Sequence, residues 1–232
     1  ENVDLNTVEP DAEAAAYIQT ITDKFDALQK QVVAKTSVEL TINGADGKRA
    51  VRNAETNLGD LCADAYRILL GADIAFVNGG GVRDNIKVGD ITYGDIIKVH
   101  PFGNEACLVE VTGQQIKDAL ELGSAAYPGE SGGFLQVSGL TYTINADIPS
   151  SVVKNDKSEF VKVDGAYRVS DIMVGGQPLD VNKTYTLASH NYMLKSGGDG
   201  INMFQDNKLL QDEVKIDNQV LINYIVNNLG GV

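Results

Sequence analysis

The chain has 232 residues, 43% of them hydrophobic and 22% charged, so it has an ordinary globular composition and enough length to bury a core. Its formal net charge of −13 argues against a surface for nucleic acid polymers, and a phosphate-bearing ligand must therefore be small and meet a local cluster of Arg or Lys. No run of 18 apolar residues predicts a transmembrane segment in this chain, and the start at Glu1 without Met indicates a fragment of a longer protein.

The first third of the chain predicts two helices and two strands. Apolar residues at helical spacing, with no Gly or Pro among them, predict one long helix over 11–35. The alternation in "SVELTING" (37–44) predicts a strand, and "GADGKR" (44–49) predicts a turn after it. A second helix is expected over 57–70, and a short buried strand over 72–78.

The rest of the chain mixes helices with strands. The predicted elements are a helical turn and strands over 91–113, a helix over 112–126 that Thr112 introduces, strands between 134 and 187 with a polar hairpin insertion at 146–159, and a helix over 217–228. The order lacks the regular alternation of strand and helix that builds a doubly wound sheet. We therefore predict the α+β class.

The cysteines and histidines suggest no metal site. Cys62 and Cys107 form no C-x-x-C or C-x-x-H pattern and are expected to be free buried thiols. His100 and His190 lie far apart in the sequence and belong to no metal-binding motif, so we interpret both as core or turn residues. The segment "FGNEAC" superficially matches the G-N-H-[DE] motif of metallophosphatases, but Glu105 stands in place of the histidine.

Three consecutive glycines follow the strand predicted over 72–78. They do not match the G-x-G-x-x-G motif, which needs a glycine where Asp84 stands, and "GADGKR" (44–49) is too short for a P-loop and lacks its Ser or Thr. Such a run often serves only to allow positive φ angles in a tight turn. Here, however, Asn78 and Arg83 flank it, so an amide and a guanidinium are carried by a backbone without side chains.

Two aromatic residues lie beside glycine turns elsewhere in the chain. Phe102 is in "PFGNE", and Tyr192 precedes "SGGDG", which contains Asp199. Each ring alone would more often belong to a packed core than to a binding site. Together with arginines and a carboxylate, however, two rings are what a nucleotide requires: stacking for the base, an acceptor for ribose hydroxyls and guanidinium groups for phosphate.

Five sequence blocks, in order, resemble the C-terminal domain of 5'-nucleotidases, the family that includes bacterial periplasmic UDP-sugar hydrolase and vertebrate ecto-5'-nucleotidase. The blocks are "RNAETNLGDLCADA", "NGGGVRDNI", "ITYGDIIKVHPFGN", "GGFLQVSGL" and "SGGDGINMF". The similarity covers about residues 36–230. It implies that residues 1–35 form a tail and an interdomain linker helix, and that residues 36–232 form a substrate-binding domain.

The resemblance also implies roles for individual residues. Phe102 and Tyr192 would enclose the nucleobase, with Tyr192 in place of the phenylalanine usual in the family. Arg83 and Arg52 would contact the nucleotide, and Arg49 is a weaker candidate because the spacing there varies. The remaining substrate-binding positions implied are Asn78 as the amide, Asp199 as the ribose-binding carboxylate, and Gly80 and Gly81 in the glycine turn.

In this family a separate N-terminal metallophosphatase domain holds two divalent metal ions and hydrolyses the nucleotide, and the C-terminal domain delivers the substrate by rotating about the linker. We therefore expect this chain to need no cofactor of its own, to bind a nucleotide or nucleoside, and to be inactive in isolation. The parent protein is expected to be extracellular, periplasmic or at the cell surface. A cell-surface binding or adhesion module and a self-contained hydrolase remain as alternatives, and the sequence upstream of Glu1 and a phosphate-release assay would distinguish them.

Overall fold

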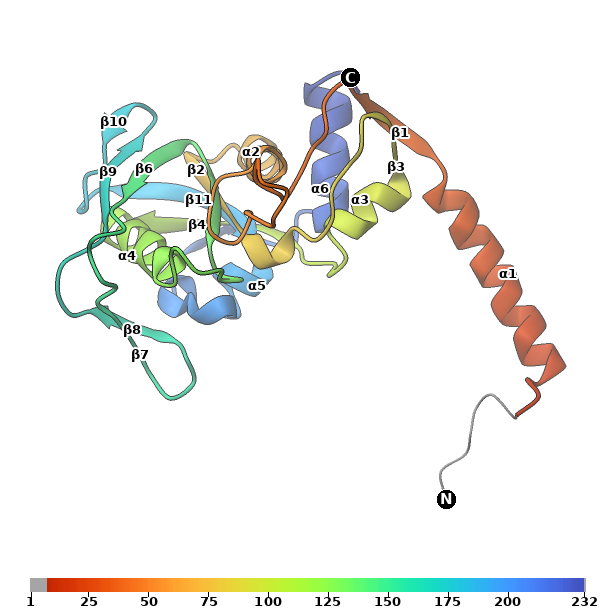
Figure 1. The fold of residues 1–232 in the computed structure, drawn as a ribbon, viewed down its shortest axis with the longest axis horizontal. Helices are drawn as coiled ribbons and strands as arrows, with labels where there is room; N and C mark the ends of the chain where they lie inside the picture. The colour runs from red at the N-terminus through yellow and green to blue at the C-terminus, as the bar shows by residue number, and fades with distance from the viewer. Residues whose placement is uncertain (1–7, 232) are drawn as a thin grey trace.

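The computed structural model describes residues 8–231 and has mixed α and β elements, which confirms the α+β class (Figure 1). The α-helices are α1 (Ala12–Gln29), α2 (Asn57–Leu70), α3 (Tyr93–Val99), α4 (Gly113–Ser124), α5 (Asn191–Leu194) and α6 (Asp217–Asn223). The strands are β1 (Val32–Thr36), β2 (Ile74–Asn78), β3 (Gly89–Thr92), β4 (Ala106–Thr112), β5 (Leu135–Ser138), β6 (Leu140–Ile144), β7 (Val152–Lys154), β8 (Phe160–Val163), β9 (Val169–Val174), β10 (Gln177–Pro178), β11 (Thr184–His190) and β12 (Leu209–Gln211).

The core is a five-stranded sheet in the order β12-β4-β11-β2-β5. Strands β11 and β2 pair in parallel, whereas the other neighbours pair in antiparallel fashion. Because β2 and β11 run in the same direction, their carboxyl ends, Asn78 and His190, lie at the same edge of the sheet. This edge positions the candidate site.

Both faces of the central sheet are covered, and strand β2 shows how. Its side chains alternate between faces, so Ala75 and Val77 pack into a core with α2, α3 and α6. Ile74 and Phe76 point the other way, into a second core with α4 and β9. All five residues of β2 are buried, which explains why the sequence shows an apolar run there rather than an alternation of apolar and polar residues.

Helix α2 coincides with its predicted range because both of its ends are encoded locally. The Thr56 hydroxyl accepts a hydrogen bond from the Gly59 N–H at 3.2 Å and caps the first turn. Gly71 ends the helix in the left-handed conformation at φ 64°. The predicted helix after Thr112 is also found, as α4, with a capping box between Thr112 and Gln115.

Helix α1 is shorter than the predicted 11–35 range. It ends at Gln29, and β1 follows as a strand that pairs with β3. The adjacent β-branched residues Val32 and Val33 favour this extended backbone once a partner strand is present. The boundary predicted at residue 36 thus falls at the end of β1, while the first seven residues of the predicted tail lie outside the described part.

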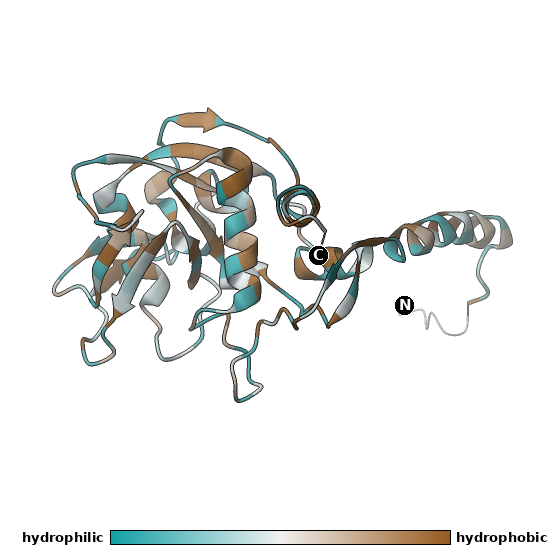
Figure 2. Ribbon diagram, turned by 90° about the horizontal axis from the view of Figure 1, so that it is seen from above, coloured by the Kyte–Doolittle hydropathy of each residue, from teal (hydrophilic) through white to brown (hydrophobic). Residues whose placement is uncertain are grey.

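Helix α1 has no buried side chain and projects away from the rest of the chain (Figure 1). Tyr17, Ile18, Ile21 and Phe25 are all exposed. Hydrophobic and hydrophilic residues are interleaved along it, as Figure 2 shows. A helix with these solvent-facing apolar side chains is typical of an element that packs against another part of a larger protein.

The strand predicted over 37–44 is wrong. That segment is irregular and makes only isolated bridges, Leu40 with Ile86 and Asn43 with Arg49. Side chains satisfy its backbone instead, since Asn85 Oδ1 accepts from the Ile42 N–H at 2.7 Å and Asn57 Oδ1 accepts from the Thr41 N–H at 2.8 Å. Neither interaction follows a local sequence pattern.

Other predictions of local structure are confirmed. The polar insertion forms part of the β7-β8 hairpin, and the last predicted helix is α6 with its continuation Tyr224–Asn228. Cys62 and Cys107 are both free and buried. Within residues 8–231, no helix is both long enough and apolar enough to cross a membrane.

Candidate functional site

A cavity of about 560 Å³ opens beyond the carboxyl ends of β2 and β11. Crevices at this edge of a sheet are common ligand sites, because loops from several strands meet there. The lining residues are Arg52, Asn78, Gly80, Gly81, Phe102, Asn104, Gly132, Tyr192 and Asp199. Seven of the eight substrate-binding residues predicted from the sequence therefore line one cavity, and the eighth, Arg83, lies beside it.

The glycine run is a short 3₁₀ turn, Gly79–Gly81, directly after β2. None of the three has a positive φ, so their conformational freedom does not explain them. They are required by close approach: a Cβ atom on Gly79 would overlap the Val51 carbonyl oxygen, and one on Gly81 would lie 2.7 Å from Asn78 Oδ1. Backbone bonds from the Gly79 N–H to the Phe134 carbonyl, at 2.7 Å, and from the Gly80 N–H to the Gly132 carbonyl, at 2.8 Å, fix the turn.

Arg83 is held above this turn. Its Nη1 donates to the Gly80 carbonyl at 3.3 Å, and its guanidinium carbon lies 5.8 Å from the centre of the Phe102 ring. That distance is within the range of a cation–π interaction. The glycine turn and Phe102 together keep the Arg83 guanidinium next to the cavity.

Arg52, Arg83 and Arg49 form a local positive cluster in an acidic chain. Burial and the neighbouring charges of Arg49 and Arg83 lower the pKa of Arg52. Arg49 is engaged elsewhere, in a bidentate ion pair with Glu130 at 2.9 and 2.5 Å, and does not line the cavity. Arg52 and Arg83 are thus the guanidinium groups placed to meet an anion.

The two predicted rings are not core residues. Phe102 is 59% exposed and Tyr192 is 39% exposed. The Tyr192 ring packs on Gly198, where a Cβ atom would overlap the ring, and its hydroxyl accepts from the Asp199 N–H at 3.1 Å. Both rings therefore offer faces to the cavity rather than to a packed interior.

Asp199 is oriented by a chain of polar contacts that begins in the core. His190 Nε2 lies 3.2 Å from Asn78 Oδ1, and Asn78 Nδ2 donates to Asp199 Oδ2 at 2.7 Å. With the Asn78 amide so oriented, His190 must be the tautomer that carries its proton on Nε2. Asp199 also has a positive φ of 55°, an unfavourable conformation for a residue with a side chain, as is often found at binding sites.

Three site residues are absent from the sequence-based prediction. Asn104 and Gly132 line the cavity, and both lie in sequence blocks that carry the family resemblance. Asn104 is anchored by its N–H, which donates to Asp217 Oδ2 at 3.0 Å. His190, expected as a core or turn residue, is indeed buried, but its ring also positions Asn78.

No three His, Cys, Asp or Glu side chains gather as a metal site anywhere in residues 8–231. The cavity is lined instead by aromatic rings, amides, one oriented carboxylate and the Arg52 guanidinium, and the Arg83 guanidinium lies beside it. This donor set suits a polar organic molecule that carries a ring and an anionic group.

Comparison with known proteins shows the family. A family model described as the 5'-nucleotidase C-terminal domain matches residues 32–206. A trifunctional nucleotide phosphoesterase of Bacillus subtilis (strain 168) is 32% identical over 222 residues, which are 91% of this chain and 14% of that protein. A 5'-nucleotidase of Vibrio cholerae is 35% identical over 183 residues, which are 78% of this chain and 29% of that protein.

A solved structure has the same fold. The crystal structure of a 5'-nucleotidase precursor from Thermus thermophilus matches with a TM-score of 0.71 and 31% identity, covering 93% of this chain and 40% of that one. This chain thus spans less than a third of the two curated relatives and two fifths of the solved structure.

Proposed function

The chain belongs to the 5'-nucleotidase C-terminal domain family, and from this premise we propose that it binds the substrate of a phosphoesterase that hydrolyses nucleotides to nucleoside and phosphate. One observation carries the proposal: two exposed rings, an oriented carboxylate and two arginines gather around a single cavity. These are complementary to the base, the ribose and the phosphate of one nucleotide.

The base would stack between Phe102 and Tyr192. The ribose hydroxyls would donate to Asp199, whose other contact, with Asn78 Nδ2, holds the carboxylate in place. The phosphate would meet Arg52 and Arg83 near the glycine turn, where no side chain obstructs its approach.

Catalysis is assigned to a part of the parent protein that precedes this chain. We propose a metallophosphatase domain with two divalent metal ions, joined through α1, in an enzyme located in the periplasm, at the cell surface or outside the cell. The small share of each relative that this chain covers and the solvent-facing apolar residues of α1 support this division of labour.

The isolated chain is expected to bind adenosine and AMP and to hydrolyse neither. Titration calorimetry measures binding, and phosphate release is followed with added Mn²⁺ or Zn²⁺. Metal-dependent turnover by the purified chain would overturn the assignment of catalysis to another domain. A failure to bind either ligand would overturn the proposed site.

The aromatic rings provide a second test. Phe102→Ala and Tyr192→Ala are each expected to weaken adenosine binding by about 1–3 kcal/mol, the scale of base stacking on an aromatic ring. Because both rings are exposed, the melting temperature should change little, whereas truncation of a core aromatic destabilises a protein by about 3–5 kcal/mol.

Two matched variants complete this experiment. Tyr192→Phe keeps the ring face and loses only the hydrogen bond from the Asp199 N–H, so its effect should be smaller than that of Tyr192→Ala. Tyr17→Ala removes an exposed ring on α1, away from the cavity, and should leave binding unchanged. If the alanine variants at 102 and 192 melt far below the parent and bind normally, the rings are structural and the stacking role is wrong.

A further inference from the structure

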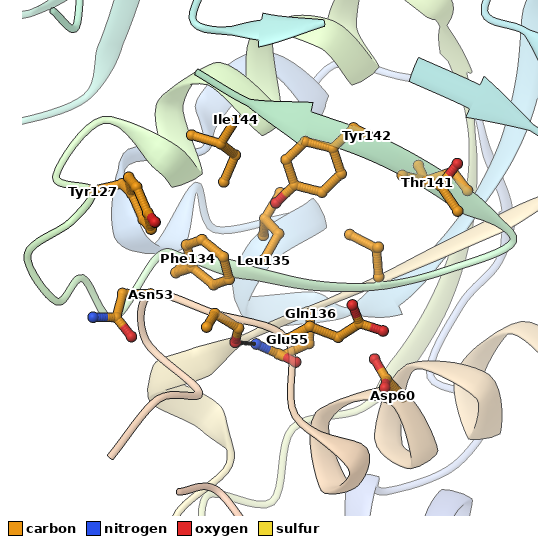
Figure 3. A pocket seen from close by; sticks show the side chains of 13 residues that line it. Asn53, Glu55, Asp60, Tyr127, Phe134, Leu135, Gln136, Thr141, Tyr142 and Ile144 are labelled. Carbon is orange, nitrogen blue, oxygen red and sulfur yellow. Dashed lines mark hydrogen bonds between the residues drawn. The ribbon is translucent and has the colours of Figure 1, made fainter. Parts of the chain in front are cut away.

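A second cavity, of about 330 Å³, shares no lining residue with the first. It lies between the segment that leads into α2 and the strands β5 and β6 (Figure 3). Part of its wall is apolar and aromatic, with the rings of Tyr127, Phe134 and Tyr142 and the side chain of Ile144. The proposed nucleotide site makes no use of it.

Glu55 and Asp60 form the acidic end of this cavity. Their carboxylates lie close together in Figure 3, one from the loop before α2 and one from the first turns of that helix. Burial and the neighbouring carboxylates of Glu55 and Asp64 raise the pKa of Asp60 to about 7. No Lys, Arg or His lines the cavity, and no ion pair in residues 8–231 involves Glu55 or Asp60.

The acidic wall is rigidly attached to the sheet. Gln136 of β5 is buried, and its Nε2 donates to the Val51 carbonyl at 3.0 Å and to the Ala54 carbonyl at 2.7 Å, the latter bond drawn in Figure 3. Its Oε1 accepts from the Thr56 N–H at 3.1 Å. On the other side Asn53 Nδ2 donates to the Pro128 carbonyl at 3.0 Å. The cavity is therefore preformed, which reduces the entropy that a ligand must lose on binding.

We propose that this cavity binds a small organic cation, with its ammonium group between Glu55 and Asp60 and its apolar body against Tyr127, Phe134 and Tyr142. A cation supplies the positive charge that the paired carboxylates lack, and aromatic faces attract cations as well as apolar groups. A nucleotide is disfavoured because its phosphate would face two carboxylates without a basic residue. A bare metal ion is disfavoured because the wall opposite the carboxylates is largely carbon.

The experiment compares three ligands of one shape: 2-phenylethylamine, which is a cation at neutral pH, the neutral 2-phenylethanol and the anion phenylacetate. We expect the amine to bind with a Kd of about 1 mM or tighter and at least about tenfold more tightly than the alcohol, with the anion weakest. Calorimetry or ligand-observed NMR measures all three. Equal affinities for amine and alcohol, or no saturable binding of the amine, would overturn the proposal.

Variants locate the bound amine. Glu55→Gln and Asp60→Asn should each weaken amine binding by about tenfold and leave 2-phenylethanol unaffected. Asp206→Asn removes an exposed carboxylate outside the cavity and serves as the control of equal charge. Melting temperatures confirm folding, and the comparison of amine with alcohol on the unaltered chain stands even if one variant fails to fold. If Asp206→Asn weakens amine binding as much as Glu55→Gln and Asp60→Asn do, the amine does not bind at a specific site in this cavity.

The pH dependence gives an independent check. The groups around Asp60 are Glu55 from the preceding loop, Asp64 from the same helix, the neutral Gln136 and, beyond Glu55, the Tyr142 hydroxyl. Because an amine binds to the ionised pair, its affinity should fall by about tenfold between pH 8 and pH 6, as Asp60 takes up a proton. In Asp60→Asn this pH dependence should disappear. An affinity that is independent of pH in the unaltered chain would count against the proposed position of the ammonium group.

Discussion

We expect simultaneous replacement of Arg52 and Arg83 by alanine to weaken AMP binding by about 3 kcal/mol or more, since one charge-assisted hydrogen bond contributes about 1.5–3 kcal/mol. Adenosine binding should change little, because the nucleoside has no phosphate. Arg52 is partly buried, and Arg83, although exposed, is held over the glycine turn by its bond to the Gly80 carbonyl, so both guanidinium groups are in place to meet the phosphate. The ratio of the AMP and adenosine dissociation constants, from calorimetry, isolates the contribution of the phosphate.

Arg49→Ala is the matched control for this prediction. Arg49 is close enough to Arg52 to affect its pKa, but its side chain is held by Glu130 outside the cavity. Arg49→Ala should therefore weaken AMP binding less than replacement of either Arg52 or Arg83 by alanine. If the double variant loses AMP and adenosine equally, the two arginines do not contact the phosphate. If Arg49→Ala has the largest effect, the phosphate contacts Arg49 instead.

The fold was predictable where residues within a short segment determine the start and the end of an element. Helix α2 begins and ends where its caps, Thr56 and Gly71, place it. The end of α1 was not predictable, because Val32 and Val33 continue a helical apolar pattern and become a strand only through pairing with β3, nearly 60 residues later in the chain. Residues 37–44 alternate like a strand, but their backbone is satisfied by Asn57 and Asn85. Long-range contacts decided both outcomes.

The candidate site was also predictable in part from local sequence and in part only from long-range contacts. The sequence blocks led us to predict Asn78, Phe102 and Asp199 as parts of one site, and the structure places them around one cavity. The link from His190 through Asn78 to Asp199 joins residues 112 and 121 positions apart, so no local pattern contains it. The glycine turn was predicted as a feature, but its cause, close approach to Val51 and Asn78 rather than positive φ, is visible only in three dimensions.

Buried histidines lie behind the cavity. His100 is 4% exposed and makes a backbone hydrogen bond with Gly81, while His190 is 2% exposed and contacts Asn78. Each has one ring nitrogen without a hydrogen-bond partner in the described residues, so protonation would bury a charge that nothing compensates. Burial lowers the pKa of His100 to about 4 and that of His190 to about 3, from an ordinary value near 6.5. Both rings are therefore neutral at physiological pH.

Acid is expected to destabilise the chain through these two residues. Because their pKa values are lower in the folded state, the unfolded chain takes up more protons below pH 6.5, and stability falls as the pH falls from about 6.5 toward 4 and 3. At about 1.36 kcal/mol per pKa unit, each histidine should cost about 2 kcal/mol between pH 7.5 and pH 5. The buried carboxyl groups Glu121 and Asp217 act in the opposite direction, because burial raises their pKa values.

Variants separate the histidines from the carboxyl groups. His190→Gln keeps an N–H that can donate to Asn78 and removes the titrating ring, and His100→Gln does the same beside Gly81. Urea unfolding at pH 7.5 and at pH 5 gives the change in the free energy of unfolding between the two pH values for each protein. That change should be smaller than in the parent by about 2 kcal/mol in each single variant and by about 4 kcal/mol in the double variant.

A loss of stability that is the same at both pH values would mean that the rings only fill space. The same pH dependence in parent and variants would show that the histidines do not link proton uptake to unfolding, and the acid sensitivity would then belong to carboxyl groups whose pKa values are lowered in the folded state, such as Asp95, Glu130 and Asp212. A reduced pH dependence of stability in both variants would support the prediction. His190, which orients Asn78, and His100, which supports the glycine turn, would then make the fold around the site stable only at pH values at which both rings are neutral.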